Sequence, residues 1–213
     1  MSLAEKLTTV AENQQRVYDA GYEKGKAEGG GGIDYDLFWH NFQGGDGTGR
    51  NSYIYAFAYD RFTDETYNPK YPIICSSGTT TAQYMFYNAS SITDTKVPID
   101  ATSASNLQNT FAQAKALVTV RNLTLKASHT YSNTFTWCTA LKNITITGVI
   151  GKSISLGDCP LTKDSILSVF NALATDVTGQ TVTFKKTALN AAFTTDEWNA
   201  LKATKTNWTY ATA

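Results

Sequence analysis

The stretch that decides the fold runs from Phe135 to Ile146 and reads Phe-Thr-Trp-Cys-Thr-Ala-Leu-Lys-Asn-Ile-Thr-Ile. Its apolar residues recur every three positions, at Phe135, Cys138, Leu141 and Ile144, and then after two positions at Ile146. A spacing of two indicates a strand, so the pattern predicts a turn of chain that leads into a short strand. The last six residues match Leu-x-x-Leu-x-Leu, which is typical of a stacked repeat.

Two earlier copies of this unit align with it. Phe86 and Phe111 open them, and Ala89 and Ala114 stand where Cys138 stands in the third copy. A unit of about 21 to 26 residues lies within the range of leucine-rich repeats. The apolar pairs that close the three units are Val97/Ile99, Leu123/Leu125 and Ile144/Ile146.

Two more units continue the series, each with a helix before its strand. The first helix lies within residues 161–173, and the second begins at Thr194, which forms a capping box with Glu197. Their strands carry Val182/Phe184 and Trp208/Tyr210. The sequence therefore predicts an α/β repeat over residues 85–213, namely a short leucine-rich-repeat solenoid with a parallel sheet of about five short strands and a C-terminal cap.

Residues 33–84 form an aromatic-rich capping module before the repeats. Asp34 is placed to cap a short helix that ends at Phe42, and the alternation from Tyr53 to Tyr59 predicts a strand. Such a cluster of aromatic residues packs as core or as a cap over the first repeat. The alternative is a platform that binds sugars.

The N-terminal segment has the spacing of a coiled coil. Leu3, Leu7, Val10, Gln14 and Val17 alternate at steps of four and three, which predicts a coiled-coil or attachment helix over residues 1–28. The four glycines at 29–32 form a linker. A helix this short needs a partner in water, so we expect a homotrimer through this segment. The alternative is a helix that folds back on its own domain.

Composition argues against several classes of function. Eighteen basic and 18 acidic residues balance, so we expect no nucleic-acid partner. We also expect neither membrane insertion nor a secretion signal, because no apolar run is long enough to span a bilayer and the first residues lack a signal pattern. Three distant cysteines, Cys75, Cys138 and Cys159, predict buried thiols. His40 and His129 alone cannot build a catalytic triad or a histidine metal site, which predicts a non-enzymatic protein without cofactors.

Strand alternation places polar side chains on the open, concave face of the predicted sheet. Threonines form the central column and asparagines and lysines flank it. We take these residues as the candidate ligand-binding site, with Tyr53 to Tyr59 as the rival site. The site comprises Asn122, Thr124, Lys126, Asn143, Thr145, Thr183 and Lys185.

The repeat units resemble the irregular, BspA-like leucine-rich repeats of bacterial surface proteins, over roughly residues 85–185. The whole layout also resembles small virion-associated proteins of phages and prophages of gut Gram-positive bacteria. This second likeness is carried by residues 3–13, 38–71 and 191–201. It implies a tail or surface component of the virion whose partners are a virion structural protein and a host-surface glycan or protein.

Two other functions stay open. A bacterial cell-surface adhesin would use the same repeat. A carbohydrate-active enzyme would use two facing carboxyl groups, for which the sequence offers several residues near the aromatic module. These are Asp34, Asp36, Asp60, Asp64 and Glu65.

The coiled-coil interpretation makes a testable prediction about assembly. Residues 33–213 alone should be a folded monomer, whereas the full chain should be an oligomer, because the apolar seam of the helix has no other partner beyond the glycine linker. Light scattering on both proteins measures this. A monomeric mass for both would contradict it.

Overall fold

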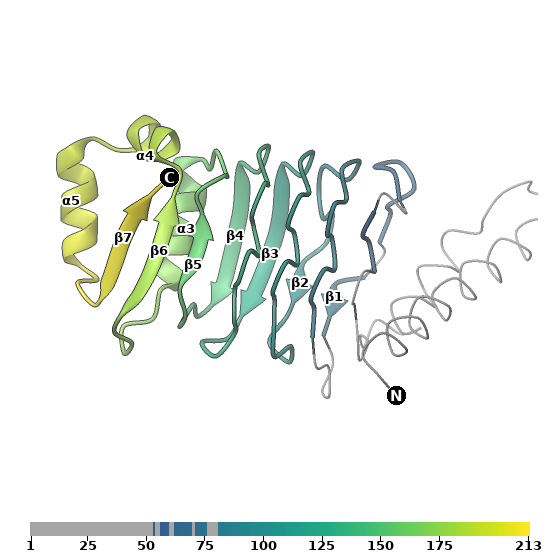
Figure 1. Cartoon of the computed structure of the whole chain (residues 1–213), viewed down its shortest axis with the longest axis horizontal. Helices are drawn as coiled ribbons and strands as arrows, with labels where there is room; N and C mark the ends of the chain where they lie inside the picture. The colour runs from purple at the N-terminus through teal and green to yellow at the C-terminus, as the bar shows by residue number, and fades with distance from the viewer. Residues whose placement is uncertain (1–52, 54–55, 60–61, 70, 76–80) are drawn as a thin grey trace, which may run out of the picture.

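The computed structural model describes residues 53, 56–59, 62–69, 71–75 and 81–213. These residues form an α/β protein with two small parallel sheets and three helices. The first sheet has the order β1 (Ile73–Ile74), β2 (Ile99–Asp100), β3 (Thr119–Leu125), β4 (Asn143–Gly148). The second has the order β5 (Ile154–Leu156), β6 (Gln180–Phe184), β7 (Trp208–Thr212). The arrows of β3 and β4 run opposite to those of β6 and β7 in Figure 1.

Successive turns of the chain lie side by side and bond to one another outside the sheets as well. The backbone N–H of Phe86 donates to the carbonyl of Thr110 (2.7 Å), and that of Phe111 donates to the carbonyl of Thr134 (3.0 Å). The rings of Phe86, Phe111 and Phe135 are stacked, with both centroid distances 5.3 Å. The predicted equivalence of these three phenylalanines is therefore confirmed.

The same backbone conformation recurs on both sides of each phenylalanine. Two residues before it, Tyr84, Asn109 and Asn133 have φ values of 58°, 56° and 56°. Two residues after it, Asn88, Gln113 and Trp137 have values of 52°, 64° and 63°. This left-handed region is uncommon for residues other than glycine, and asparagine adopts it most readily. Each turn thus bends in the same way at the same two positions.

The cysteines are free and buried, as predicted. The thiol of Cys138 donates to the carbonyl of Phe111 (3.0 Å), and that of Cys159 lies 3.7 Å from the carbonyl of Phe135. Both thiols therefore occupy the same place in successive turns. Burial raises the pKa of Cys75 and of Cys138 to about 12, which keeps these thiols protonated and unreactive at neutral pH.

The strand register differs from the predicted alignment by two residues. We expected Val97, Leu123 and Ile144 side by side, but Leu123 pairs with Ile99 on one side and with Ile146 on the other. On the β4 side, a bulge in β3 between Val120 and Leu123 also changes the offset between the strands by one residue. A shift of two preserves the inward and outward assignment, and Leu123 and Ile144 are buried.

The predicted single sheet of five strands is wrong in one respect. Val182/Phe184 lie on β6, which pairs with β5 rather than with β4, and Trp208/Tyr210 lie on β7, which pairs with β6. The helix α3 (Lys163–Ala172) closes the free edge of β4 instead. The hydroxyls of Ser165 and Ser168 accept from the backbone N–H groups of Ile144 (2.9 Å) and Ile146 (2.8 Å).

The helix predicted within residues 161–173 and the predicted start of the last helix are confirmed. Thr162 caps α3, and Thr194 caps α5 (Thr195–Ala203) in a complete capping box with Glu197. The short helix α4 (Lys186–Ala192) was not predicted. Trp198 of α5 contacts the rings of Phe170, Phe184 and Tyr210, and so packs this helix against the last two strands.

The described part of the aromatic module packs onto the same stack. Phe57 lies 4.8 Å from Phe86 between ring centroids, and β1 pairs with β2. The residues described between 53 and 59 form turns rather than the predicted strand. The consecutive residues Phe57 and Ala58 are both buried, whereas in a strand successive side chains would point to opposite faces. The predicted coiled coil, the glycine linker and the helix from Asp34 to Phe42 lie outside the described residues.

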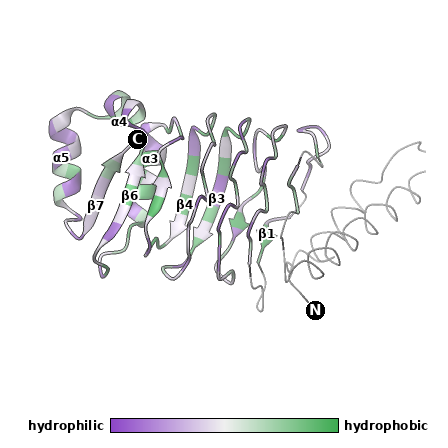
Figure 2. Cartoon of the chain, viewed as in Figure 1, coloured by the Kyte–Doolittle hydropathy of each residue, from purple (hydrophilic) through white to green (hydrophobic). Residues whose placement is uncertain are grey.

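Hydrophobic and hydrophilic segments alternate along β3 and β4 in Figure 2. Neighbouring residues of β4 therefore face opposite sides of the sheet, and a buried residue and its exposed neighbour make a matched pair of substitutions. Ile144→Ala should lower the free energy of unfolding by about 2 to 5 kcal/mol, because the side chain is 3% exposed and packs between turns. Thr145→Ala, on the open face, should cost less than about 1 kcal/mol. Urea denaturation measures both. Equal losses would contradict the assignment of faces.

Candidate functional site

The structure divides the predicted binding residues between the two sheets. Asn122 and Thr124 lie on β3, and Asn143 and Thr145 lie on β4. Lys126 follows the end of β3 and is exposed. The other two members of the predicted site, Thr183 on β6 and Lys185 directly after it, belong to the second sheet. The predicted surface is therefore two surfaces.

The first surface is a groove at the bulge of β3, here called the strand-face groove. Its volume is about 360 Å³. Because the bulge adds a residue to β3, Arg121 and Asn122 together face Thr145, and Asn122 has a φ of 39°. The groove is lined by Lys96, Pro98, Thr119, Val120, Arg121, Asn122, Asn143 and Thr145.

The charges of the strand-face groove are partly paired. Arg121 forms a two-pronged contact with Asp94, with Nη2 2.6 Å from Oδ2 and Nε 2.9 Å from Oδ1. This hydrogen bond raises the pKa of Arg121 above its ordinary value. Lys96 donates to the carbonyl of Asp64 and lies 5.9 Å from the ring centroid of Tyr67. The groove thus combines fixed cations with neutral amides and hydroxyls.

Beside this groove, Thr124 stands next to Thr147 rather than next to Thr145. The two hydroxyls are 2.7 Å apart, and Asp100 is the register partner of Thr124 on the other side. The Asp100 carboxylate is occupied, since it accepts from the backbone N–H (2.9 Å) and the hydroxyl (2.7 Å) of Thr102. The register that follows the bulge of β3 places Thr147 beside Thr124.

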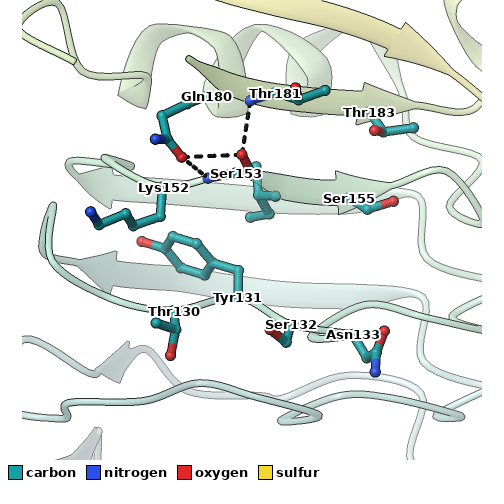
Figure 3. Close-up of a pocket in the computed structure, with 11 residues that line it drawn as sticks. Thr130, Tyr131, Ser132, Asn133, Lys152, Ser153, Ser155, Gln180, Thr181 and Thr183 are labelled. Atoms are coloured by element: carbon teal, nitrogen blue, oxygen red, sulfur yellow. Dashed lines mark hydrogen bonds between the residues drawn. The ribbon is translucent and has the colours of Figure 1, made fainter. Parts of the chain in front are cut away.

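The second surface is a hollow on the other sheet, here called the polar hollow. It lies between residues 130–133, residues 152–155 and the strand β6, with a volume of about 440 Å³ (Figure 3). Thr183 is part of its lining. Gln180 Oε1 accepts from the backbone N–H (2.8 Å) and the hydroxyl (3.1 Å) of Ser153, which orders one side of the hollow.

The rival aromatic site is mostly buried where the structure describes it. Tyr53 and Phe57 are fully buried, whereas Tyr59 is 54% exposed. The exposed aromatic residue that sequence analysis missed is Trp137, which is 58% exposed and has Lys115 5.6 Å from its ring centroid. Trp137 directly precedes Cys138, which the spacing of the unit places inward. A position next to an inward residue is the signal that could have identified Trp137 as exposed.

His129 is fully buried, in edge-to-face contact with Tyr131. Its Nδ1 accepts from the backbone N–H of Lys126 at 3.3 Å. Burial lowers the pKa of His129 below its ordinary value and the charge of Lys126 lowers it further, although the carbonyls of Ala104 and Ala101 oppose this. His129 is therefore a neutral imidazole that packs in the core.

Among the described residues, no three His, Cys, Asp or Glu side chains come together as a metal site would require. Within the same part of the chain, no helix is long and apolar enough to cross a membrane. Of the carboxylates considered for an enzyme, Asp64 accepts from the backbone N–H (3.0 Å) and hydroxyl (2.9 Å) of Thr93, and these bonds lower its pKa. Asp34, Asp36 and Asp60 lie outside the described residues.

Comparison of the chain with protein-family models, with curated proteins and with solved structures gave no match.

The buried imidazole predicts a pH dependence of stability. The unfolded chain takes up a proton on His129 below a pH of about 6.5, whereas the folded chain resists it, so stability should fall as the pH drops from 7 to 5. His129→Asn, which keeps an acceptor for the Lys126 N–H, should reduce this slope by at most about 1.4 kcal/mol per pH unit. Urea titrations at several pH values measure it. Identical slopes would show that His129 does not titrate differently on unfolding.

Proposed function

We propose that this protein is a non-enzymatic component of a phage particle, in the tail or on the virion surface, that binds a host-surface or mucosal ligand. The stacked turns form a short leucine-rich-repeat solenoid in this proposal. Its support is the recurrence of one unit: stacked phenylalanines, left-handed residues two positions to either side, and a small residue or thiol three positions after. Within each of the two sheets, every strand pairs with the next strand in the chain, which agrees with the proposal.

The observation that carries the binding proposal is the strand-face groove. Its neutral polar side chains stand on paired strands, and the Arg121–Asp94 pair holds its one guanidinium in place. Groups that are already fixed lose little entropy when a ligand binds, so such a surface binds without the cost of ordering a loop. A hydroxyl-rich or amide-rich ligand matches the asparagine and threonine groups.

Attachment to the particle is assigned to residues 1–28. An oligomeric helix at one end and a folded binding module at the other would place several copies of the strand-face groove on one particle. Several weak contacts then act together, because after the first one forms the others are intramolecular. The expected partners are a second and a third copy of this chain and a virion structural protein.

The alternative is a bacterial cell-surface adhesin that uses the same face. The neighbouring genes separate the two proposals, since tail and lysis genes favour the virion component and genes for surface-anchored proteins favour the adhesin. An enzyme is less well supported, because the Asp64 carboxylate already accepts two hydrogen bonds from Thr93.

Binding by the strand-face groove can be tested on the full chain. The double variant Thr124→Glu, Thr145→Glu should stay folded, because both side chains lie on the open face, and it should lose attachment to gut Gram-positive cells by at least about tenfold, since it adds two charges beside the groove. Flow cytometry with labelled protein measures attachment. Thr209→Glu, on the exposed face of β7, is the matched control. Undiminished attachment of the double variant would remove the groove from the proposal.

A further inference from the structure

We propose that the polar hollow binds a saccharide, and that Tyr131, Ser155 and Thr183 contact it. This inference rests on the proposed binding function and adds a ligand class and a second surface, on the sheet that does not carry the strand-face groove. The hollow has about 440 Å³ of space, within the range of pockets that hold small molecules. Figure 3 shows the rows of chain that line it.

The hollow lies where the ladder between turns is interrupted. Backbone N–H groups of Leu107, Asn109, Phe111 and Gln113 all donate to the turn that follows, at residues 130–136. Residues 130–136 make no such backbone bond to residues 151–158, both segments being fully described. The two rows are joined instead beyond the hollow, where the backbone N–H of Trp137 donates to the Asp158 carboxylate at 2.7 Å.

Tyr131 presents an unused polar group at this place. Its side chain is 4% exposed, and its hydroxyl has no hydrogen-bond partner among the described residues. Burial raises the pKa of this hydroxyl, which therefore stays protonated and able to donate. A buried hydroxyl without a partner costs free energy, and a ligand that accepts from it recovers that cost. Lys152 lines the same hollow, and its exposed side chain is free to change rotamer.

The opposite wall offers hydroxyls at fixed spacing. Ser155 and Thr183 are register partners on β5 and β6, so their outward side chains stand next to each other. Ser153 is held between Gln180 and the backbone N–H of Thr181 (2.9 Å). Paired strands hold these groups in position, as a binding site requires.

The lining favours a saccharide over a peptide. A peptide strand added to a sheet needs pockets for alternate side chains, whereas the side chains that line this hollow are mostly hydroxyls and amides. Vicinal hydroxyls of a sugar both donate and accept, which matches the serine and threonine groups. Lys152 is the one charged side chain of the lining, and it suits a sugar that carries a carboxylate.

The test uses the full chain on an array of printed bacterial and mucosal glycans, neutral and acidic. We expect binding to at least one glycan. Tyr131→Phe removes only the hydroxyl, so it should weaken that binding roughly three- to tenfold while the melting temperature stays the same or rises. The double variant Ser155→Ala, Thr183→Val should weaken it further. Thr209→Val, on the neighbouring strand outside the hollow, should leave it unchanged.

Two results would overturn the inference. One is no binding to any printed glycan, and the other is glycan binding that neither Tyr131→Phe nor the double variant weakens. Cell attachment distinguishes this failure from failure of the proposed function. Attachment that survives periodate oxidation of the cells but is lost after protease treatment would assign a protein ligand, which leaves the binding function intact and excludes the saccharide.

Discussion

The backbone hydrogen bonds between successive turns are the constraint on which this structure depends. A residue such as Phe86 donates to the next turn, and the equivalent residue Phe111 repeats the contact one turn later. Because each turn must match its neighbour over its whole path, its bends recur at the same positions, which is why left-handed residues stand two positions before and after each phenylalanine. The phenylalanine rings fill the space between turns at 5.3 Å, a separation typical of stacked aromatic pairs.

The ladder ends where the next unit changes length. Cys159 keeps its hydrogen-bonding place near Phe135, but it follows Cys138 by 21 residues, whereas Phe135 follows Phe111 by 24. On the other side, α3 occupies the edge of β4, and two serine hydroxyls replace the strand that would otherwise bond there. Of the following strands, β6 pairs with β5 and β7 pairs with β6, so they belong to the second sheet. A change in unit length therefore accompanies both the change of sheet and the opening of the polar hollow.

The recurring phenylalanines and the start of the last helix could be predicted from the sequence because their signals are local. The phenylalanines, the small residues after them and the capping box at Thr194 depend on spacing within one unit, and the structure agrees on each. The sheet assignment of β6 depends on whether a helix or a strand takes the edge of β4, and spacing carries no information on that choice. The exact register was not predictable either, because a shift of two residues keeps the same side chains inward, and the one-residue bulge in β3 leaves the hydrophobic pattern on both sides intact.

The candidate site was predicted in part for the same reason. Alternation correctly placed Asn122, Thr145 and Thr183 on open faces, but it could not assign them to separate sheets. A regular ladder pairs its own donors and acceptors, so polar groups become available to a ligand where the repeat is irregular. The strand-face groove lies at the bulge of β3 and the polar hollow lies at the break after residue 136. In a stack of this kind, departures from the repeat are therefore where binding surfaces should be sought, and a regular unit mainly sets the distance between them.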